Sequence, residues 1–368
     1  MTRVALLTEI PAPFRVPLFN ELAARDGIEL RVLFLSLRDP KRPYPVLHDE
    51  FAFEWEALPG RDLLHGSRWV VGNAGVARAL RKSRPDVIVL GGWNQPAFWR
   101  AALLARRARV PYLVWVESTE RDARSGFAGF EAAKRALLRG AAGALVPGRA
   151  SAEYVARLGV PRERVRIAPN AVDERPFRLR VDELRRDREA LRAELGVTAP
   201  LVLQVARLDP EKGVDMLVRA TEGLGVELAL AGTGAEADEL RRIASAGTRF
   251  LGFLPAEELV RWYAAADVFV LASRSEQWGM VVNEAAAAAL PIETTEAVGA
   301  AYDLVEEGVS GFRVPPGAGR ALRSAIERLV VADGLRARAG ARSRELAATH
   351  TPEAWADAVE ALAREVVS

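Results

Sequence analysis

The chain alternates short apolar runs of strand length with helical patterns, and it does so in both of its halves. In the first half the runs are Val4–Thr8, Leu30–Leu35, Val87–Leu90, Tyr112–Val116, Ala144–Val146 and Val165–Ile167. Strands that alternate with helices predict a doubly wound parallel α/β sheet, because parallel neighbours must be joined by a crossover. Ligands of such sheets bind beyond the carboxyl ends of the strands, so we expect the loops there to carry the function.

The length of the chain predicts two such domains. A chain of 368 residues is too long for one ordinary domain and long enough for two separate cores. We expect a first domain over residues 1–172 and a second over 200–351. The charged segment 173–199 is expected to connect them as a solvated helix. A last helix is expected over residues 352–368.

Composition excludes several classes of protein. Half of the residues are hydrophobic, so the chain is not disordered. It has no cysteine, which excludes disulfides, thiolate nucleophiles and cysteine metal sites. The apolar run near the start is broken by Glu9 and Pro11, and no segment offers eighteen clean apolar residues. A cytoplasmic protein is the simplest expectation.

Charge is divided unevenly along the chain. Residues 1–170 hold 27 Lys and Arg against 17 Asp and Glu, a net +10, and the remainder holds 24 against 32, a net −8. The basic half suggests an anionic partner, either a phosphorylated or lipid-linked acceptor or an anionic membrane that meets the arginines of the helix Phe98–Arg109. The alternatives are that arginine richness reflects genome composition and that this helix face is merely solvated. No nucleic-acid partner is expected.

The segment Ala272–Gly317 contains the pattern that points most directly to a ligand. Glu276 and Glu284 have seven residues between them, and Gly279 lies in that interval. A buried strand is predicted over Val268–Leu271 and an alanine-rich helix over Met280–Leu290, so the first carboxylate lies on a loop and the second on the helix. Carboxylates suit sugar hydroxyls, and unpaired amides at a helix N-terminus suit phosphate, so this combination predicts a sugar-nucleotide site.

Two further loops of the second half could contribute to the same site. Arg207 and Lys212 follow a predicted strand at Leu201–Val205, where two cations could hold a diphosphate from two sides. As an alternative, they could be ordinary surface charges in a turn. Gly232, Gly234 and Ala237 satisfy the dinucleotide pattern G-x-G-x-x-G/A. That pattern follows the second predicted strand of the domain and has no acid about twenty residues on, so the NAD interpretation is the weaker one.

These motifs resemble those of the retaining glycosyltransferases of family 4. The two glutamates match the E-x7-E signature, Arg207 and Lys212 match its G-R-L…K-G segment with Ala206 for glycine, and Pro169–Asp173 resembles its PNGVD. The resemblance implies the GT-B fold, in which two Rossmann-like doubly wound domains face each other across a cleft. It also implies that the last helix, Pro352–Val367, crosses back to the first domain. A nucleotide sugar would be the donor substrate.

The resemblance also assigns roles within the donor site. It implies that Glu284 binds the nucleotide ribose and Glu276 the donor sugar, with the backbone of Trp278, Gly279, Met280 and Val281 near sugar and phosphate. Gly232 would form a turn beside the donor, and the backbone at Phe253 and Leu254 would face the base. Glu293 departs from the family, which has an apolar residue there. It could be a functional change, an edge-exposed residue or a sequence error.

On the acceptor side, three strand-end loops of the first half hold the candidates. The first is stiffened by Pro11, Pro13 and Pro17 where relatives carry glycines, and Arg15 could supply charge there or be a surface residue. Trp93, Asn94 and Gln95 could form a wall for sugar faces, or Trp93 could pack on the sheet. Glu117 lies where relatives often have histidine. It could orient or deprotonate an acceptor hydroxyl, or it could stand beside a helix cap.

No metal or other cofactor is expected. The sequence has no D-x-D triplet, and His48, His65 and His350 are dispersed along it. Arg207, Lys212 and helix amides would then meet the charge of the leaving group. The predicted activity is metal-independent glycosyl transfer to a glycan, lipid-linked or small-molecule acceptor. An NAD-dependent oxidoreductase and a non-catalytic sugar-nucleotide binder are the alternatives.

Overall fold

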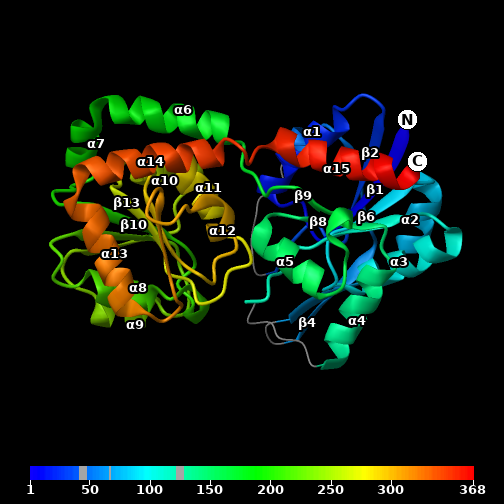
Figure 1. Cartoon of the computed structure of the whole chain (residues 1–368), viewed down its shortest axis with the longest axis horizontal. Coiled ribbons are helices and arrows are strands. Elements are labelled where there is room, and N and C mark those ends of the chain that lie inside the picture. Colours follow the sequence, from blue (N-terminus) through cyan, green and yellow to red (C-terminus); the bar gives the residue numbers. More distant parts are fainter. Residues whose placement is uncertain (41–47, 66–67, 122–127) are drawn as a thin grey trace. The chain divides into compact units, whose positions relative to one another are not determined.

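The computed structural model describes the chain except for residues 41–47, 66–67 and 122–127 (Figure 1). The chain divides into two compact units. The first comprises residues 1–120, the segment that ends at Ala171, and Pro352–Ser368. The second comprises Val172–Thr351 together with Arg121. Each unit is a parallel sheet with helices on both faces, so the predicted fold class is confirmed.

In the first unit the sheet has seven parallel strands in the order β3-β2-β1-β6-β7-β8-β9. The strands are β1 (Thr2–Thr8), β2 (Ile28–Phe34), β3 (Glu54–Ala57), β6 (Val87–Leu90), β7 (Tyr112–Trp115), β8 (Gly143–Val146) and β9 (Val165–Ile167). A separate antiparallel hairpin consists of β4 (Gly60–His65) and β5 (Arg68–Asn73). The strand order reverses between β1 and β6, which makes the loops after these strands the switch point where ligands bind in such sheets.

Helices cover both faces of this first sheet. They are α1 (Val16–Ala23), α2 (Val76–Ser83), α3 (Pro96–Ala108), α4 (Ala128–Arg139), α5 (Arg149–Arg157) and α15 (Pro352–Val367), with 3-10 turns at Pro13–Arg15, His48–Glu50 and Arg162–Arg164. Helix α15 packs on α1, and Trp355 is buried against Trp115 and Phe19. The last helix therefore completes the core of the first unit, although it follows the whole second unit in sequence.

In the second unit the sheet has six parallel strands in the order β12-β11-β10-β13-β14-β15. They are β10 (Leu201–Val205), β11 (Glu227–Ala231), β12 (Thr248–Gly252), β13 (Val268–Leu271), β14 (Ile292–Thr295) and β15 (Gly311–Val314). The switch point lies between β10 and β13, so the loops after these two strands lie where a ligand is expected.

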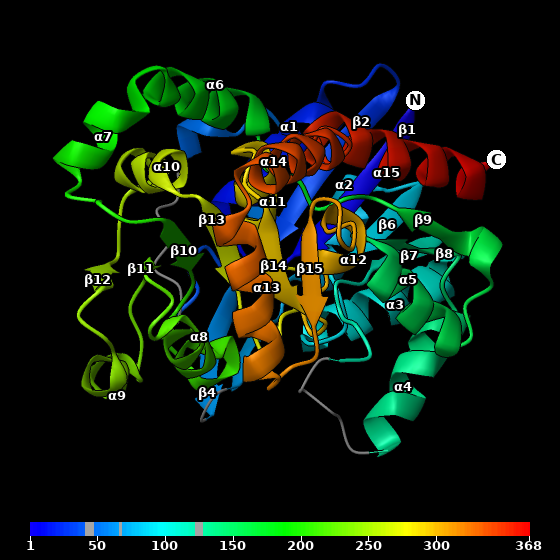
Figure 2. The same cartoon turned by 60° about the vertical axis from the view of Figure 1, so that its left-hand side comes forward.

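The helices of the second unit also form two layers. They are α6 (Glu174–Leu184), α7 (Arg188–Glu194), α8 (Val214–Thr221), α9 (Ala237–Ile243), α10 (Ala256–Ala265), α11 (Met280–Ala287), α12 (Ala301–Leu304), α13 (Gly319–Val331) and α14 (Asp333–Ala347), with 3-10 turns at Arg185–Asp187 and Pro210–Lys212. Helices α8 and α13 pack side by side on one face of the sheet (Figure 2). Helices α6, α10 and α11 contribute to the core on the other face.

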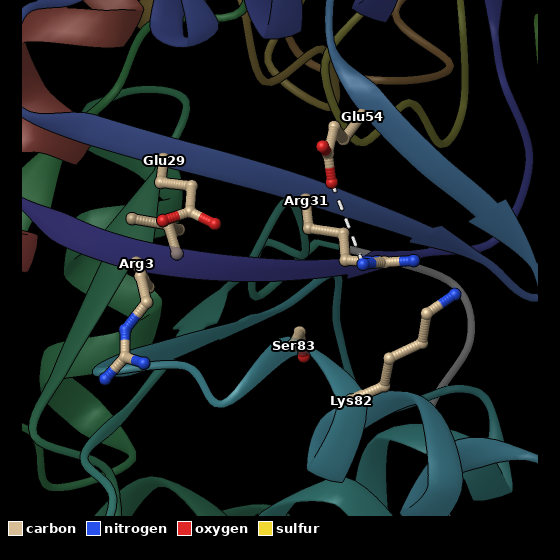
Figure 3. A pocket seen from close by; sticks show the side chains of 7 residues that line it. Arg3, Glu29, Arg31, Glu54, Lys82 and Ser83 are labelled. Carbon is tan, nitrogen blue, oxygen red and sulfur yellow. Dashed lines mark ion pairs between the residues drawn. The ribbon is translucent and has the colours of Figure 1, made fainter.

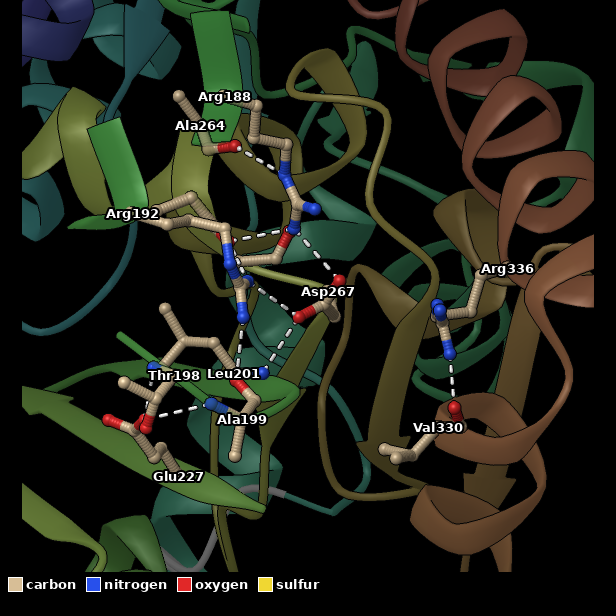
Figure 4. A network of polar contacts seen from close by, with 12 residues as sticks. Arg188, Arg192, Thr198, Ala199, Leu201, Glu227, Ala264, Asp267, Val330 and Arg336 are labelled. Carbon is tan, nitrogen blue, oxygen red and sulfur yellow. Dashed lines mark hydrogen bonds and ion pairs between the residues drawn. The ribbon is translucent and has the colours of Figure 1, made fainter. Parts of the chain in front are cut away.

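Residues 173–199 form part of the second unit instead of a solvated connector. Val181 of α6 is fully buried. The arginines of α7 bind to the residue that precedes β13 and to neighbouring backbone carbonyl groups (Figure 4). Arg188 and Arg192 both pair with Asp267, at 2.8 and 2.9 Å. Burial alone would raise the pKa of Asp267, but the N–H of Leu201 and the two guanidinium groups lower it below its ordinary value.

Glu293 lies inside the second sheet. It belongs to β14, which has β13 and β15 as neighbours, and it is in register with Val270 and Phe312. Its side chain is 0% exposed, and neither carboxyl oxygen has a hydrogen-bond partner among the described residues. The alternative of an edge-exposed residue is therefore wrong. Within the described residues, no helix is both long and apolar enough to cross a membrane.

Candidate functional site

At the switch point of the second unit, the loops after β10 and β13 touch each other. Gly213, which precedes α8, has a φ of 61°, and a Cβ atom there would lie 2.2 Å from the carbonyl oxygen of Ala272. Only glycine allows both this backbone conformation and this approach. The contact brings Lys212 of one loop beside Glu276 of the other.

Lys212 and Glu276 form an ion pair at the centre of this site. The distance from Lys212 Nζ to Glu276 Oε2 is 2.5 Å, and the side chains are 12% and 20% exposed. The backbone of Glu276 is also fixed, because its N–H donates to Ala297 and its carbonyl accepts from Gly299. A lysine and a carboxylate are thus held together in a partly buried position where either one can exchange its partner for a ligand.

Arg207 lies on the same loop as Lys212 but has different partners. Its guanidinium pairs with Asp209 and, at 2.5 Å, with Glu211. The side chain is 52% exposed. The structure therefore brings Lys212 to Glu276 and holds Arg207 beside two local carboxylates, with about half of its surface open to a ligand.

Helix α11 begins beside this pair. Gly279 precedes it with a φ of 97°, a conformation that favours glycine. Trp278 is buried, and its indole Nε1 donates to Asn283 Oδ1 at 2.8 Å. In the described part of the chain, no protein oxygen accepts a hydrogen bond from the N–H of Met280 or Val281. These two amides are donors that a phosphate or a sugar hydroxyl could use.

Glu284 projects from the next turn of α11 and is half-buried. Burial raises the pKa of its carboxyl above the ordinary value, and the hydroxyl of Tyr263, which donates to Oε2 at 2.7 Å, acts in the opposite direction. Burial next to Glu284 also raises the pKa of Tyr263 well above its ordinary value. The hydrogen bond from Tyr263 therefore fixes the orientation of the Glu284 carboxylate.

The G-x-G-x-x-A segment has a structural explanation that needs no dinucleotide. It lies between β11 and α9, after the second strand of the unit in sequence. Gly232 has a φ of 139°, and its Cβ would lie 1.9 Å from the carbonyl oxygen of Ala206. A Cβ atom at Gly234 would lie 2.4 Å from the carbonyl group of Leu208. Both glycines are therefore required for the packing of this turn on the loop that carries Arg207.

Two other predicted donor residues follow β12. Phe253 is 80% exposed, which is unusual for a phenylalanine side chain. Leu254 is half-buried and packs on the core formed with α10 and α11. The segment therefore presents one aromatic ring to the surface, next to the end of a strand.

The first unit has a polar cluster at the carboxyl ends of β1 and β7. Arg15 lies 4.7 Å from the ring centre of Trp115 and donates to Thr8 Oγ1 at 2.8 Å. It also pairs with Glu117 at 3.0 Å, and Asn170 donates to the same carboxylate oxygen at 3.3 Å. The predicted Arg15 and Glu117 are thus in contact, and Arg15 is a partly buried member of the cluster instead of a surface cation.

A second carboxylate in this unit was not predicted. The side-chain amides of Asn94 and Gln95 both donate to Glu9 Oε1, at 2.8 and 2.7 Å. Glu9 follows β1 and the two amides follow β6, so the three residues lie at the switch point. The position of Glu9 directly after a predicted strand was a usable signal.

Trp93, by contrast, is a packing residue. Its ring is buried, Lys134 Nζ lies 5.2 Å from its centre, and Tyr154 meets it edge-on. Gln95 is also buried and accepts a hydrogen bond from the N–H of Val71 at 2.9 Å. Of the two interpretations of Trp93, the structure matches packing and not an exposed wall for sugar faces. Among the three predicted residues, Asn94 alone is exposed.

Family comparisons cover most of the chain in two adjoining matches. Residues 16–171 match the family described as "Glycosyl transferase 4-like domain". Residues 187–346 match the family described as "Glycosyl transferases group 1". The two matches correspond closely to the two structural units.

Individual relatives agree with the family matches. The chain is 34% identical over 210 residues to a D-inositol 3-phosphate glycosyltransferase of Xylanimonas cellulosilytica, covering 53% of this chain and 50% of that protein. It is 29% identical over 286 residues to an alpha-D-kanosaminyltransferase of Streptomyces kanamyceticus, covering 72% of this chain and 73% of that protein. The match thus spans about half the length of the first of these relatives.

Solved structures share the fold over nearly the whole chain. The structure of HepE from Anabaena, in complex with UDP and glucose, matches with a TM-score of 0.74 and 21% identity. The match covers 98% of this chain and 99% of HepE. This similarity shows that the fold of the chain is a known one.

Proposed function

We propose that the chain is a glycosyltransferase with the GT-B fold, as the family matches of its two halves and the shared fold support, and that it transfers a sugar from a nucleoside diphosphate donor to an acceptor hydroxyl. The observation that carries the proposal is the contact between Lys212 and Glu276 beside the N-terminus of α11. One cation, one carboxylate and free helix amides at a switch point suit a diphosphate that carries a sugar. HepE, which has the same fold, was solved with UDP and glucose.

In this proposal the second unit holds the donor. Lys212 binds the diphosphate together with the N–H groups of Met280 and Val281, and Arg207 adds charge from its half-exposed position. When the diphosphate takes over Lys212, Glu276 becomes available to accept hydrogen bonds from sugar hydroxyls. Glu284, which Tyr263 holds in place, would accept from the ribose. The exposed ring of Phe253 belongs to the segment whose backbone the family resemblance assigns to the base.

We extend the proposal to a metal-independent reaction with retention at the anomeric carbon. The bond between the sugar C1 and the β-phosphate oxygen breaks, and the acceptor oxygen forms its bond to C1 from the same face. The acceptor proton passes to the departing phosphate, so the products are a glycoside and a nucleoside diphosphate. Lys212 and the helix amides stabilise the charge that develops on the leaving group. Support comes from the cation and amides at the site and from the absence of a D-x-D triplet in the sequence.

The first unit is proposed to bind the acceptor. Two carboxylates of this unit, those of Glu9 and Glu117, follow strands of the sheet. Each accepts hydrogen bonds from polar side chains. Carboxylates in such positions can accept hydrogen bonds from an acceptor hydroxyl and orient it toward the donor. The acceptor class is a glycan, a lipid-linked sugar or a small polyol. The basic face of α3, with Arg100, Arg106 and Arg107 exposed and Arg109 directly after the helix, supports a version in which the protein meets an anionic membrane.

The test is nucleotide release from a panel of UDP-sugars and GDP-sugars with EDTA present. We expect at least one donor to release its nucleoside diphosphate, and Lys212→Ala to abolish most of that release. Lys82→Ala removes a lysine at an exposed position of the first unit and serves as the matched control. Loss of release on chelation would contradict the metal-free reaction. Binding of a donor without any turnover would favour the non-catalytic binder.

Two further measurements separate the remaining alternatives. Titration with NADH, followed by tryptophan fluorescence against a UDP-sugar control, tests the oxidoreductase interpretation. Saturable NADH quenching without a response to any nucleotide sugar would support it. Sedimentation with anionic and neutral liposomes tests membrane contact. Equal binding to both would contradict the membrane version and leave the donor proposal intact.

A further inference from the structure

A pocket of about 360 Å³ lies in the second unit between α8 and the beginning of α13. Its lining includes the apolar side chains of Met216 and Ala220, which are buried. Gly317 and Gly319, which follow β15, also line the pocket. Small-molecule sites usually have volumes of about 300 to 1,000 Å³ and a largely apolar lining with a few polar groups. The pocket therefore has the size and lining of a small-molecule site.

Four arginines, Arg219, Arg274, Arg320 and Arg323, line this pocket together with one carboxylate. That carboxylate, Asp215, forms ion pairs with two of them, at 2.8 Å with Arg274 and at 3.1 Å with Arg219. Arg323 donates to backbone carbonyl groups of Ala220 and Glu222, which carry no net charge. The lining thus has a net charge of +3, in a half of the chain whose net charge is −8.

The position of the fourth arginine adds to this excess. Arg320 lies in the first turn of α13, a helix of thirteen residues with no acidic residue in that turn. It is exposed. The positive end of the helix dipole and this guanidinium act in the same direction, since both favour an anion in the pocket.

A second pocket in the same protein provides a comparison, because each cation in its lining has an acidic partner. It has about 60 Å³ and lies at the amino ends of β1, β2 and β3 (Figure 3). Arg3 pairs with Asp86, Arg31 with Glu54 and Glu56, and Lys82 with Glu56. Its charges are balanced within the protein, whereas those of the pocket beside α13 are not.

We propose that the pocket between α8 and α13, defined by Arg219, Arg274, Arg320 and Arg323, binds a small phosphorylated molecule. Guanidinium groups bind phosphate through paired, charge-assisted hydrogen bonds, and the apolar side chains of Met216 and Ala220 suit the less polar part of the ligand. Lys212 and Glu276 do not line this pocket, so it is distinct from the proposed donor site. The inference does not rest on the proposed function. A free sugar phosphate and a lipid phosphate share the required chemistry.

The experiment is calorimetric titration of the full chain with glucose 1-phosphate while saturating UDP occupies the donor site. We expect saturable binding, and at least a tenfold loss of affinity in a double variant with Arg219→Ala and Arg320→Ala. The matched control changes Arg241→Ala and Arg242→Ala, two exposed arginines of α9 in the same unit. Thermal melts establish that both variants fold. If UDP itself fails to bind, the same titration without UDP still compares the variants.

Dihexanoyl phosphatidic acid and the corresponding neutral diacylglycerol form the second arm of the experiment. Binding of the phosphatidic acid alone, with the same dependence on the two arginines, would identify the source as a lipid phosphate. Binding of glucose 1-phosphate would identify a free phosphorylated metabolite. The proposal is overturned if no phosphate probe binds or if the arginine variant and the control bind equally. It is also overturned if an acidic peptide binds through these arginines while every phosphate probe fails.

Discussion

Replacing Glu293 by leucine should stabilise the protein. The side chain is fully buried on β14 between Val270 and Phe312, and its carboxyl oxygens have no hydrogen-bond partner among the described residues. Burial raises the pKa of this carboxyl well above its ordinary value, the charge of Glu307 adds to the effect, and Arg328 opposes it. Burial therefore favours the neutral form of this carboxyl and costs the folded state free energy.

Two contributions set the expected size of this effect. An unpaired buried polar group costs about 1–3 kcal/mol on the scale of protein mutations. Ionisation adds a second contribution, because the pKa of unfolded glutamate is about 4.3 whereas the pKa of the folded carboxyl is higher. Each pH unit between the unfolded and the folded pKa then costs the folded state about 1.4 kcal/mol. The stability linked to this proton is thus fully present at low pH and decreases as pH rises toward the folded pKa.

The assay is thermal and urea unfolding of the Glu293→Leu and Glu293→Gln variants between pH 5 and pH 8. At pH 5 the leucine variant should gain about 1–3 kcal/mol, or roughly 2–10 °C in Tm for a domain of this size. Its advantage over the wild type should increase with pH. Glutamine, which keeps a buried polar group but cannot ionise, should gain mainly at the higher pH. Glu257→Gln, at an exposed position of α10, is the control.

One result would refute this reasoning directly. If the leucine variant is less stable than the wild type at pH 8, the carboxyl has a partner that stabilises the fold. A difference in stability that does not change with pH would show that folding does not raise the pKa of this carboxyl.

Four other substitutions test the site and the fold. Lys212→Ala should remove about 2–4 kcal/mol of transition-state stabilisation, which lowers kcat/KM for donor cleavage by roughly 30- to 900-fold, and an unchanged rate would exclude Lys212 from the site. Gly232→Ala should lower stability by about 1–3 kcal/mol and weaken UDP binding, because its Cβ would overlap the carbonyl of Ala206 at a positive φ; normal UDP affinity in calorimetry would show that the turn adapts. Glu117→Gln should reduce transfer to acceptor while leaving donor hydrolysis unchanged, and equal loss of both would place Glu117 outside acceptor binding. Asp267→Ala should destabilise the second unit by about 3–5 kcal/mol in urea unfolding, since two arginines lose their carboxylate, and a loss below about 1 kcal/mol would contradict that role.

The sequence predicted the parts of the fold that are buried on both faces. Strands β6, β10 and β13 are buried almost throughout and have the predicted limits, because largely apolar runs bounded by polar residues are easily recognised. Strand β9, a partly exposed edge strand that contains Arg166, also has the predicted limits. Strand β3 and the hairpin of β4 and β5 were not predicted, because their sequences mix charged and apolar residues. Val181 and the arginines of α7 were interpreted as solvated, since a charged sequence does not show that guanidinium groups will pair with Asp267.

The candidate site was predictable to a similar extent. The sequence predicted that Lys212 and Glu276 belong to one site, but their direct contact depends on β10 and β13 being neighbours, which the alternating pattern alone does not give. The partners of Arg207 could not be predicted, because they depend on how one short loop folds on itself. Glu9 was overlooked because its importance comes from amides 85 and 86 residues further along the chain. The exposed Asn94 and the buried Trp93 are adjacent in sequence, and only packing distinguishes their roles.

A crystal of the protein soaked with UDP tests the central claim most directly. The account predicts that the diphosphate lies at the switch point of the second unit, within hydrogen-bond distance of Lys212 Nζ and of the N–H groups at the start of α11. A diphosphate bound at any other place, with the pair between Lys212 and Glu276 undisturbed, would contradict it.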